Sequence, residues 1–355
     1  FTMSGQLNSP NSVAPGPPEQ FARFSESLNR FQRIQRFLHN QPTAAPFLVL
    51  LMAILLFSLL VGDRFFHPFN LSLVVQQVTI IGVLGAAQTL IILTAGIDLS
   101  VGAMMVLSSV VMGRMAMHYG LPAELAILVG TVVGALAGMI NGFLVTRLRL
   151  PPMIATLGTY NIFFALNLWY SRSETIRSQD IEATAPLLQW LGSSFEFFGA
   201  RLTFGSIFLI LLFAAIWFAL NWTAWGRHVY ATGDDPEAAQ LAGIPTQKIL
   251  LSVYVVAGIV CALAAWVLIG RIGSVSPQAG LTANLDSITA VVIGGTSLFG
   301  GRGSIFGTLI GALIVGIFRN GLALAGVDVL WQEFTVGALI IVAVSLDHWI
   351  RKVAA

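Results

Sequence analysis

Eight amide, hydroxyl and carboxylate side chains in or beside the apolar stretches of this chain are candidates for contact with a polar substrate: Gln76, Gln77, Gln88, Asp98, Asn141, Thr156, Asn161 and Asn167. Such groups exchange hydrogen bonds with uncharged, hydroxyl-rich molecules. Five of them are our candidates for a substrate path: Gln88, Asp98, Asn141, Thr156 and Asn161. Asp98 is the most distinctive, because an ionisable group at membrane depth is costly and is usually functional. Capping of a helix that starts near Ser100, at the membrane interface, is an equally good interpretation of Asp98. For Asn161 and Asn167, hydrogen bonding between helices is the favoured role.

The side chains needed for catalysis do not occur in a usable pattern. His118 and His228 fall in different loops, so no Ser–His–Asp arrangement and no metal-ligand spacing is predicted. Cys261 is the only cysteine and lies in an apolar run, which is typical of a small core residue. Only two lysines occur, and neither completes a phosphate-binding Gly-x-x-x-x-Gly-Lys loop. We therefore expect no catalytic residues, no metal site and no cofactor bound by this chain.

The composition places these polar groups in a membrane protein. Hydrophobic residues make up 56% of the 355 residues and charged residues only 10%, against roughly 25% charged in soluble domains. The mean hydropathy is +0.83. A net charge of +2 gives no reason to expect a nucleic-acid partner. Because the chain is so apolar, the predicted partner is the lipid bilayer. The predicted fold is an all-α polytopic bundle of about ten spans, some of them discontinuous: 46–62, 71–95, 101–117, 123–146, 153–170, 204–221, 249–269, 282–298, 304–319 and 329–347.

The polar ends and loops give the expected organisation around a transmembrane domain at 46–350. Residues 1–19 are rich in Pro and Ser and are predicted to be a disordered cytoplasmic tail. Residues 20–40 combine apolar and Arg positions at helical spacing, which predicts an amphipathic helix on the membrane surface or against the protein's own loops. The excess of basic residues in short loops predicts cytoplasmic N- and C-termini. The cytoplasmic set would be Arg23, Arg30, Arg33, Arg36, Arg147, Arg149, Arg227, Lys248, Arg302, Arg351 and Lys352.

Glycines mark the places where helices should approach closely or break. They recur every fourth residue at Gly130, Gly134, Gly138 and Gly142, and again at Gly303, Gly307 and Gly311. Such stripes let two backbones approach each other closely. A glycine-broken stretch precedes each stripe, at 94–102 and 294–301. This pairing suggests a duplicated fold with broken helices near a transport path, although close packing without a repeat explains the stripes nearly as well.

Two loops are candidates for contact with other proteins. The external loop at 171–203 carries carboxylates and aromatic residues, which suits either a partner or a short interfacial helix. In the cytoplasmic loop at 222–248 we expect a short helix capped by Asp234 or Asp235, with Pro236 in its first turn. Gly243 would end this helix in the left-handed conformation. So short a helix needs a partner surface, on this chain or on another.

This cytoplasmic loop resembles the coupling segment of permeases in ATP-binding-cassette importers. Its sequence Gly-Asp-Asp-Pro-Glu-Ala-Ala-Gln-Leu-Ala-Gly-Ile at 233–244 is similar to the monosaccharide branch of the family, which carries ribose, xylose, arabinose and fructose. Residues 93–102, Asn141-Gly142 with Arg147, and 288–304 share the likeness, which runs from about Phe47 to the C-terminus. The resemblance implies that these residues couple the chain to an ATPase: Gly233, Asp234, Asp235, Pro236, Glu237, Ala238, Ala239, Leu241 and Gly243.

The resemblance also implies a function and a set of partners. The chain would be the permease subunit of an importer in the bacterial inner membrane, carrying fructose or, next, ribose or a related sugar. Its partners would be a second copy or close paralogue, a periplasmic sugar-binding protein and a cytoplasmic ATPase that binds ATP and Mg²⁺. The main alternative is an ion-coupled secondary sugar transporter, for which only Asp98 and Asp286 would offer intramembrane carboxylates. A membrane-embedded enzyme is a further alternative, without a supporting cluster.

Overall fold

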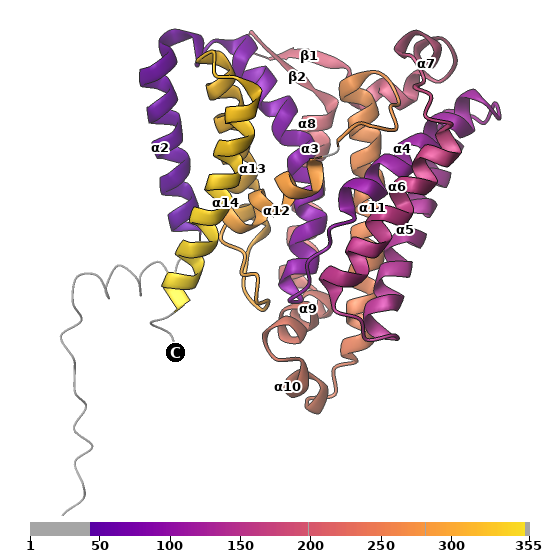
Figure 1. Ribbon diagram of the computed structural model, residues 1–355, viewed down its shortest axis with the longest axis vertical. Helices are drawn as coiled ribbons and strands as arrows, with labels where there is room; N and C mark the ends of the chain where they lie inside the picture. Colours follow the sequence, from indigo (N-terminus) through magenta and orange to yellow (C-terminus); the bar gives the residue numbers. More distant parts are fainter. Residues whose placement is uncertain (1–42, 198, 281, 352–355) are drawn as a thin grey trace, which may run out of the picture.

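The computed structural model describes residues 43–351, except for residues 198 and 281 (Figure 1). The tail predicted at 1–19 and the amphipathic helix predicted at 20–40 lie outside the described residues. Each of the ten predicted apolar segments contains the greater part of one helix. These helices are α2 (Ala44–Val61), α3 (Pro68–Leu93), α4 (Val101–Met117), α5 (Ala123–Thr146), α6 (Pro152–Ser171), α8 (Phe204–Trp222), α11 (Thr246–Ile272), α12 (Ala283–Ile293), α13 (Ile305–Leu324) and α14 (Val329–Arg351).

The helices differ in whether they can cross a membrane alone. Among the described residues, six are long and apolar enough to do so: α2, α3, α5, α8, α11 and α13. By contrast, α4 has 17 residues and α12 only 11, fewer than the roughly 20 that a complete crossing needs. The polytopic helical bundle is thus confirmed, and the number of complete spans among these ten helices is smaller than ten by this measure.

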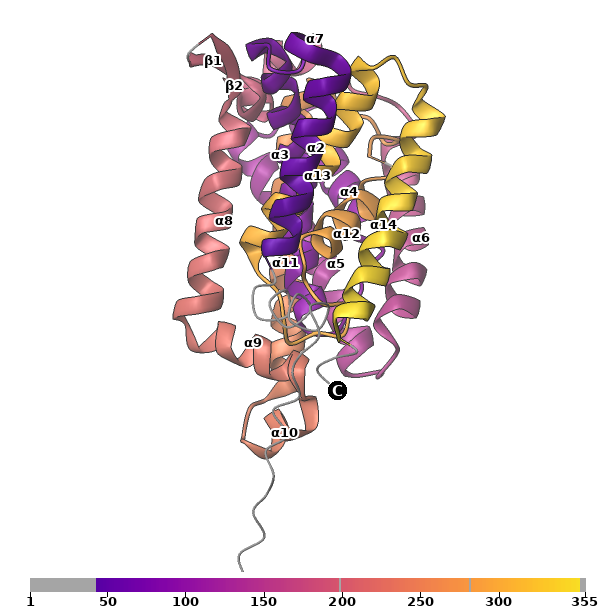
Figure 2. The same cartoon turned by 90° about the vertical axis from the view of Figure 1, so that its left-hand side faces the viewer.

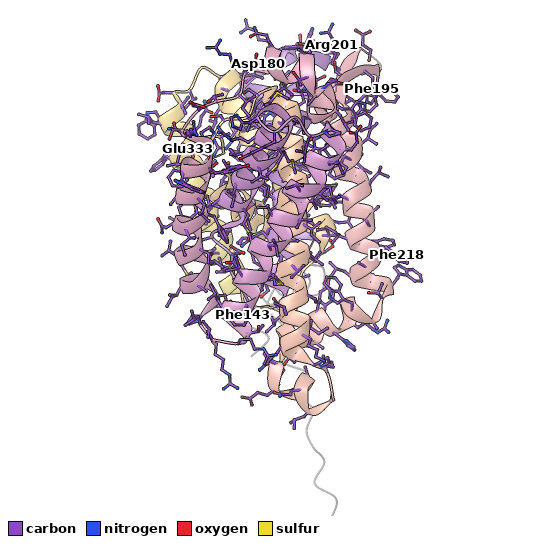
Figure 3. The ribbon with its side chains drawn as sticks, turned by 90° about the vertical axis from the view of Figure 1, so that its right-hand side faces the viewer. Phe143, Asp180, Phe195, Arg201, Phe218 and Glu333 are labelled. Carbon is purple, nitrogen blue, oxygen red and sulfur yellow. The ribbon has the colours of Figure 1, made fainter. Side chains whose placement is uncertain are left out.

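Short elements occupy the two ends of the bundle (Figures 1 and 2). A 3-10 turn, η1 (Gly62–Arg64), joins α2 to α3. At the same end, the predicted loop 171–203 folds into α7 (Ser178–Thr184), η2 (Pro186–Gly192) and the antiparallel hairpin of β1 (Ser194–Phe197) with β2 (Ala200–Thr203). Figure 3 shows Asp180, Phe195 and Arg201 gathered at this end. At the opposite end, α9 (Ala224–Asp234) and α10 (Pro236–Leu241) project beyond the bundle.

The hairpin is the one departure from the all-α prediction among the described elements. Its register pairs Ser194 with Thr203 and Phe197 with Ala200. Phe195 also packs against Phe204, with ring centroids 5.5 Å apart. The strands are too short to be recognised from the hydropathy pattern, and tertiary contacts such as this one stabilise them.

Glycine contacts hold the centre of the bundle together. On α5, a Cβ atom at Gly134 would lie 2.5 Å from the carbonyl oxygen of Gly258 on α11, and one at Gly138 would collide with the carbonyl of Tyr254. On α13, Gly307 and Gly311 lie against the backbone of α12 in the same way. The predicted close approach is therefore confirmed at both stripes. Gly303 is an exception, because it precedes α13 and lies in the loop before it.

Large apolar side chains cover the outer helices instead of lying inside the protein. Leu59 of α2 is 77% exposed, and α5, α6 and α8 carry further exposed Leu, Ile and Phe residues. Phe218 projects outward from α8 (Figure 3). Such a belt of exposed apolar residues suits contact with lipid.

Replacement of Gly138 by Ala should destabilise the bundle, because its new methyl group would force α5 away from the carbonyl of Tyr254. We expect a loss of about 1–3 kcal/mol, measured as a lower melting temperature of the purified protein in detergent. Gly158→Ala on α6 is the matched control, since a Cβ there meets no atom within 4 Å. A Gly138→Ala protein that melts at or above the wild-type temperature would show that α5 and α11 do not approach as closely as described.

Candidate functional site

The break between α3 and α4 contains the predicted polar residues. Helix α3 ends at Leu93, and Ala95 turns the chain with φ +59°. Residues 94–100 then run between helices without regular structure of their own. Backbone N–H and C=O groups away from water need partners. Side chains from three helices, α3, α6 and α12, supply such partners here.

Asp98 is the centre of a buried hydrogen-bond network. Its Oδ1 accepts from the backbone N–H of Ser100 at 2.7 Å and from the Ser100 hydroxyl at 2.6 Å. Its Oδ2 accepts from Nδ2 of Asn141 on α5 at 3.1 Å. The same Nδ2 donates to Ser100 Oγ at 2.8 Å, and Asn141 Oδ1 accepts from Thr159 on α6 at 2.6 Å. The carboxylate therefore joins α5 and α6 to the start of α4.

Three more side chains bind the backbone of the break directly. With its amide oriented to satisfy both groups, Gln88 donates to the carbonyl of Asp98 at 3.1 Å and accepts from its N–H at 3.2 Å. Thr156 Oγ1 of α6 accepts from the N–H of Leu99 at 3.1 Å. Asn284 Nδ2 of α12 donates to the carbonyl of Leu99 at 3.2 Å. The backbone of the break is thereby fastened to α3, α6 and α12.

The structure brings together four of the five predicted path residues: Gln88, Asp98, Asn141 and Thr156. Asn161 is not among them, because it is exposed on α6 and donates to the carbonyl of Leu157 in its own helix, at 3.0 Å. Asp98 does not cap α4 in the usual way: Ser100 is the N-cap, no side chain accepts from the N–H groups of the first turn, and Asp98 Oδ1 accepts from the N–H of Ser100 itself. Contact of these residues with a substrate stays a prediction.

Three members of this network were not predicted: Ser100, Thr159 and Asn284. Thr159 follows Thr156 by three residues, which places both on one face of α6, and that spacing was the available signal. Asn167 does not bond to another helix as favoured. Its Nδ2 donates to the carbonyl of Pro277, in the chain that precedes α12, at 2.7 Å.

The second glycine-broken stretch meets the first at the end of α9. Gly301 N–H donates to the carbonyl of Leu93, the last residue of α3, at 2.9 Å. Gly233 lies so close to both that a Cβ there would collide with the Leu93 carbonyl and lie 2.8 Å from Gly301 N. Tyr230 of α9 donates its hydroxyl to the Gly303 carbonyl at 3.0 Å. Burial raises the pKa of Tyr230, which keeps this donor protonated.

The short helix predicted in the 222–248 loop is present as α10. Asp235 is its cap, accepting from the N–H groups of Glu237 at 3.0 Å and Ala238 at 2.9 Å. Pro236 occupies the first position, and Gly243 has φ +83°. Helix α9 was not predicted. Its support is tertiary: Trp225 Nε1 donates to Ser252 of α11 at 2.8 Å.

Most of α10 packs against nothing else in the described part of the chain, residues 43–351 without 198 and 281. Ala239 is 5% exposed, whereas Leu241 is 90% exposed. The side chains of Pro236, Glu237 and Ala238 are exposed as well. An apolar Leu held out at the tip of a capped helix can contribute little to the stability of this chain alone, so the surface suits another protein.

A second, partly buried charge cluster links α12, α13 and α14. Arg319 contacts Asp286 at 2.7 Å and Glu333 at 2.7 Å. Both carboxylates considered for ion coupling, Asp98 and Asp286, thus have close partners. Within the described part of the chain, no three His, Cys, Asp or Glu side chains are grouped closely enough to hold a metal ion.

Known proteins are similar to this chain over most of its length. Residues 70–344 match the family described as Branched-chain amino acid transport system / permease component. The chain is 57% identical over 324 residues to the fructose import permease protein of Rhizobium meliloti, which covers 91% of this chain and 90% of that protein. It is 39% identical over 330 residues to the ribose import permease protein of Bacillus subtilis, covering 91% and 98%. It is 32% identical over 314 residues to the galactose/methyl galactoside import permease protein of Escherichia coli, covering 84% and 91%. No solved protein structure matches the chain significantly.

Exchanging Asp98 and Asn141 should distinguish the hydrogen bond between these two side chains from the contribution that each makes on its own. Asp98→Asn sets an amide donor against Asn141 Nδ2, and Asn141→Asp sets two carboxylates together. Each should cost about 1–3 kcal/mol, read as a lower melting temperature in detergent. The double exchange restores one donor–acceptor pair and should recover part of that loss. Strictly additive losses would show that Asp98 and Asn141 do not bond.

Proposed function

Since the chain belongs to the Branched-chain amino acid transport system / permease component family, we propose that it is the membrane permease subunit of an ATP-binding-cassette importer of a monosaccharide. Fructose is the proposed sugar, with ribose or a related sugar next. The observation that carries this proposal is the 57% identity to a fructose import permease over 91% of the chain. The relatives at lower identity are named for ribose and galactose, which supports the class of sugar more broadly.

The protein is a multi-pass inner-membrane protein, and we propose that α10 lies on the cytoplasmic side. Arg227 lies in α9 and Lys248 in the first turn of α11, next to α10, whereas the hairpin end mixes basic residues with the carboxylates of Glu174, Asp180, Glu182 and Glu196. An excess of basic residues in short loops favours the cytoplasm. Both termini would then be cytoplasmic, and the hairpin end would face the periplasm and its sugar-binding protein.

In this orientation α10 is positioned as the docking element for the ATPase. Its exposed side chains, Glu237, Ala238 and Leu241, would contact the partner, while Ala239 holds the helix to this chain. ATP and Mg²⁺ would be bound by the ATPase subunit, and a second copy or close paralogue would complete the membrane unit. No coupling ion is needed in this scheme, which agrees with the paired states of Asp98 and Asp286.

The junction at Gly233 offers a route from α10 into the membrane. Helix α10 follows α9 directly at Asp235, and Gly233 touches the ends of both broken stretches. A displacement of α10 by the ATPase would therefore reach the 94–100 break and the 294–304 loop together. We propose this junction as the place where ATP-driven motion enters the sugar path.

Uptake of radiolabelled fructose should depend on this chain in cells from which it can be deleted. We expect fructose uptake to fall to background without it, with excess ribose competing more weakly than unlabelled fructose and xylose measured alongside. Restoring the chain on a plasmid is the control. If none of the three sugars depends on the chain, the sugar assignment is wrong.

Charge reversal on the exposed face of α10 should uncouple the importer. In Glu237→Lys combined with Ala238→Trp, both changes point away from this chain, so folding should be kept while uptake falls about tenfold or more, as for the loss of a docking hot spot. Uptake and the amount of protein in the membrane are the measurements. Glu124→Lys in the first turn of α5, an equal charge reversal at an exposed residue outside both loops proposed for partner contact, is the control. Normal uptake by the double variant would exclude α10 as the coupling element.

A further inference from the structure

Three exposed polar side chains follow one outer face of the bundle down to its middle. Asn161 lies at the middle of α6, and Gln278 and Thr282 lie in the stretch that leads from α11 into α12. We call these three residues the outer strip. Figure 1 shows α12, which Thr282 directly precedes, starting part-way through the bundle. Hydrocarbon supplies no hydrogen bonds to polar groups at that depth, so the outer strip has to face water or another protein.

The two segments that carry the outer strip lie side by side. Asn167, further along α6, donates through Nδ2 to the carbonyl of Pro277 at 2.7 Å, directly before Gln278. Tyr160, next to Asn161, lines a small hollow together with Pro277. The middle of α6 and the stretch before α12 therefore form one continuous surface.

This surface differs from the opposite side of the bundle. Figure 1 shows α6 and α14 turned toward the viewer, with α4 and α12 between them, and Figure 2 places α6 and α14 at one edge and α8 at the other. The structure describes α8 in full, and every exposed residue between its first and last turns is apolar, including Ile210 and Leu211, each 64% exposed. The outer side of α8 thus suits lipid, whereas α6 carries an exposed amide at its middle.

Asn161 keeps hydrogen-bonding capacity for a group outside its own helix. Its Nδ2 donates to the carbonyl of Leu157 at 3.0 Å, which is its only side-chain hydrogen bond to the described part of the chain. An amide side chain has one acceptor oxygen and two N–H donors. Oδ1 and one N–H therefore remain for an outside partner. A sugar hydroxyl both donates and accepts a hydrogen bond, which matches this pair.

The four buried candidates for the substrate path have no such capacity. Gln88, Asp98, Asn141 and Thr156 are each 0% exposed, and they bind one another or the backbone of the 94–100 break. A sugar could reach them only by displacing these bonds, which hold the start of α4. Contact with the outer strip needs no such rearrangement.

We propose that the outer strip contacts the transported sugar, in a water-filled passage whose other wall is the same face of a second copy of this chain. Two copies related by a twofold axis present the same surface to each other. The inference rests on the proposed function, which supplies both the sugar and the second copy. It leaves to the Asp98 network the task of holding this wall in place.

Asn161→Leu distinguishes a sugar contact from a residue that faces lipid. Leucine suits lipid better than asparagine, so the amount of protein in the membrane should be unchanged. We expect the rate of fructose uptake to fall about fivefold, as for the loss of one hydrogen bond, and Asn161→Gln, which keeps the amide, to recover most of it. Asn221→Leu is the matched control. Asn221 is an exposed amide on α8 that donates to the carbonyl of Trp217 in the same way, at 2.9 Å, and its replacement should leave uptake unchanged.

Thiol labelling tests the water-filled passage in cells that contain the whole importer. Cys261 is 0% exposed, so the wild-type chain should give little background. A charged thiol reagent reacts with the thiolate, which forms in water and not in hydrocarbon. We expect Asn161→Cys and Gln278→Cys to be labelled, and excess fructose to slow both reactions. Leu211→Cys, on the lipid-facing side of α8, should stay unlabelled.

The outer strip is not a sugar contact if Asn161→Leu, present at the wild-type amount, carries fructose at the wild-type rate. Labelling of Asn161→Cys that fructose does not slow, or no labelling at all, would lead to the same conclusion. Failure of the proposed function looks different: the wild-type chain itself would then support no uptake of fructose, ribose or xylose.

Discussion

A backbone that leaves its helix inside a membrane protein must find partners for its N–H and C=O groups within the protein. Residues 94–100 meet this requirement through buried polar side chains of the neighbouring helices. Gln88 bonds both backbone groups of Asp98, and Thr156 and Asn284 bond those of Leu99. The carboxylate of Asp98 then orders Ser100 at the start of α4. The half-length of α4 is thus made possible by polar residues on α3, α5, α6 and α12.

Close backbone contact is the second constraint, and glycine meets it in two settings. Between α5 and α11, small residues let two regular helices approach each other. At Gly233, Gly300 and Gly301 the contact is between loops and helix ends, where a side chain on any of the three would strike a neighbouring backbone or Ala95. The helix stripe gives rigidity, whereas the loop junction brings the base of α10 against both breaks.

Much of this arrangement could be predicted from the sequence, because its signals are local. Apolar length placed ten helices, glycine spacing placed the close contacts, and Asp235, Pro236 and Gly243 defined α10. The partners across the fold could not be predicted. Thr159 and Asn284 are ordinary helix residues until tertiary packing brings them to the break, and α9 depends on its packing against α11. Asn161 failed as a member of the network because a polar residue in an apolar helix can also face outward. The hairpin escaped prediction because its strands have four residues each.

The break connects the base of α10 to the start of α4. At one end of residues 94–100, Ala95 lies against Gly300, which also touches Gly233 near the base of α10. At the other end, Ser100 leads into Gly102, which lies against Asn284 in the first turn of α12. Between them, the bonds of Asp98 and Leu99 to four helices prevent the segment from deforming independently. A segment held in this way moves as one unit, so a displacement at one of its ends also displaces the other. Movement at Gly233 would therefore shift the start of α4 without any helix of the bundle having to unwind.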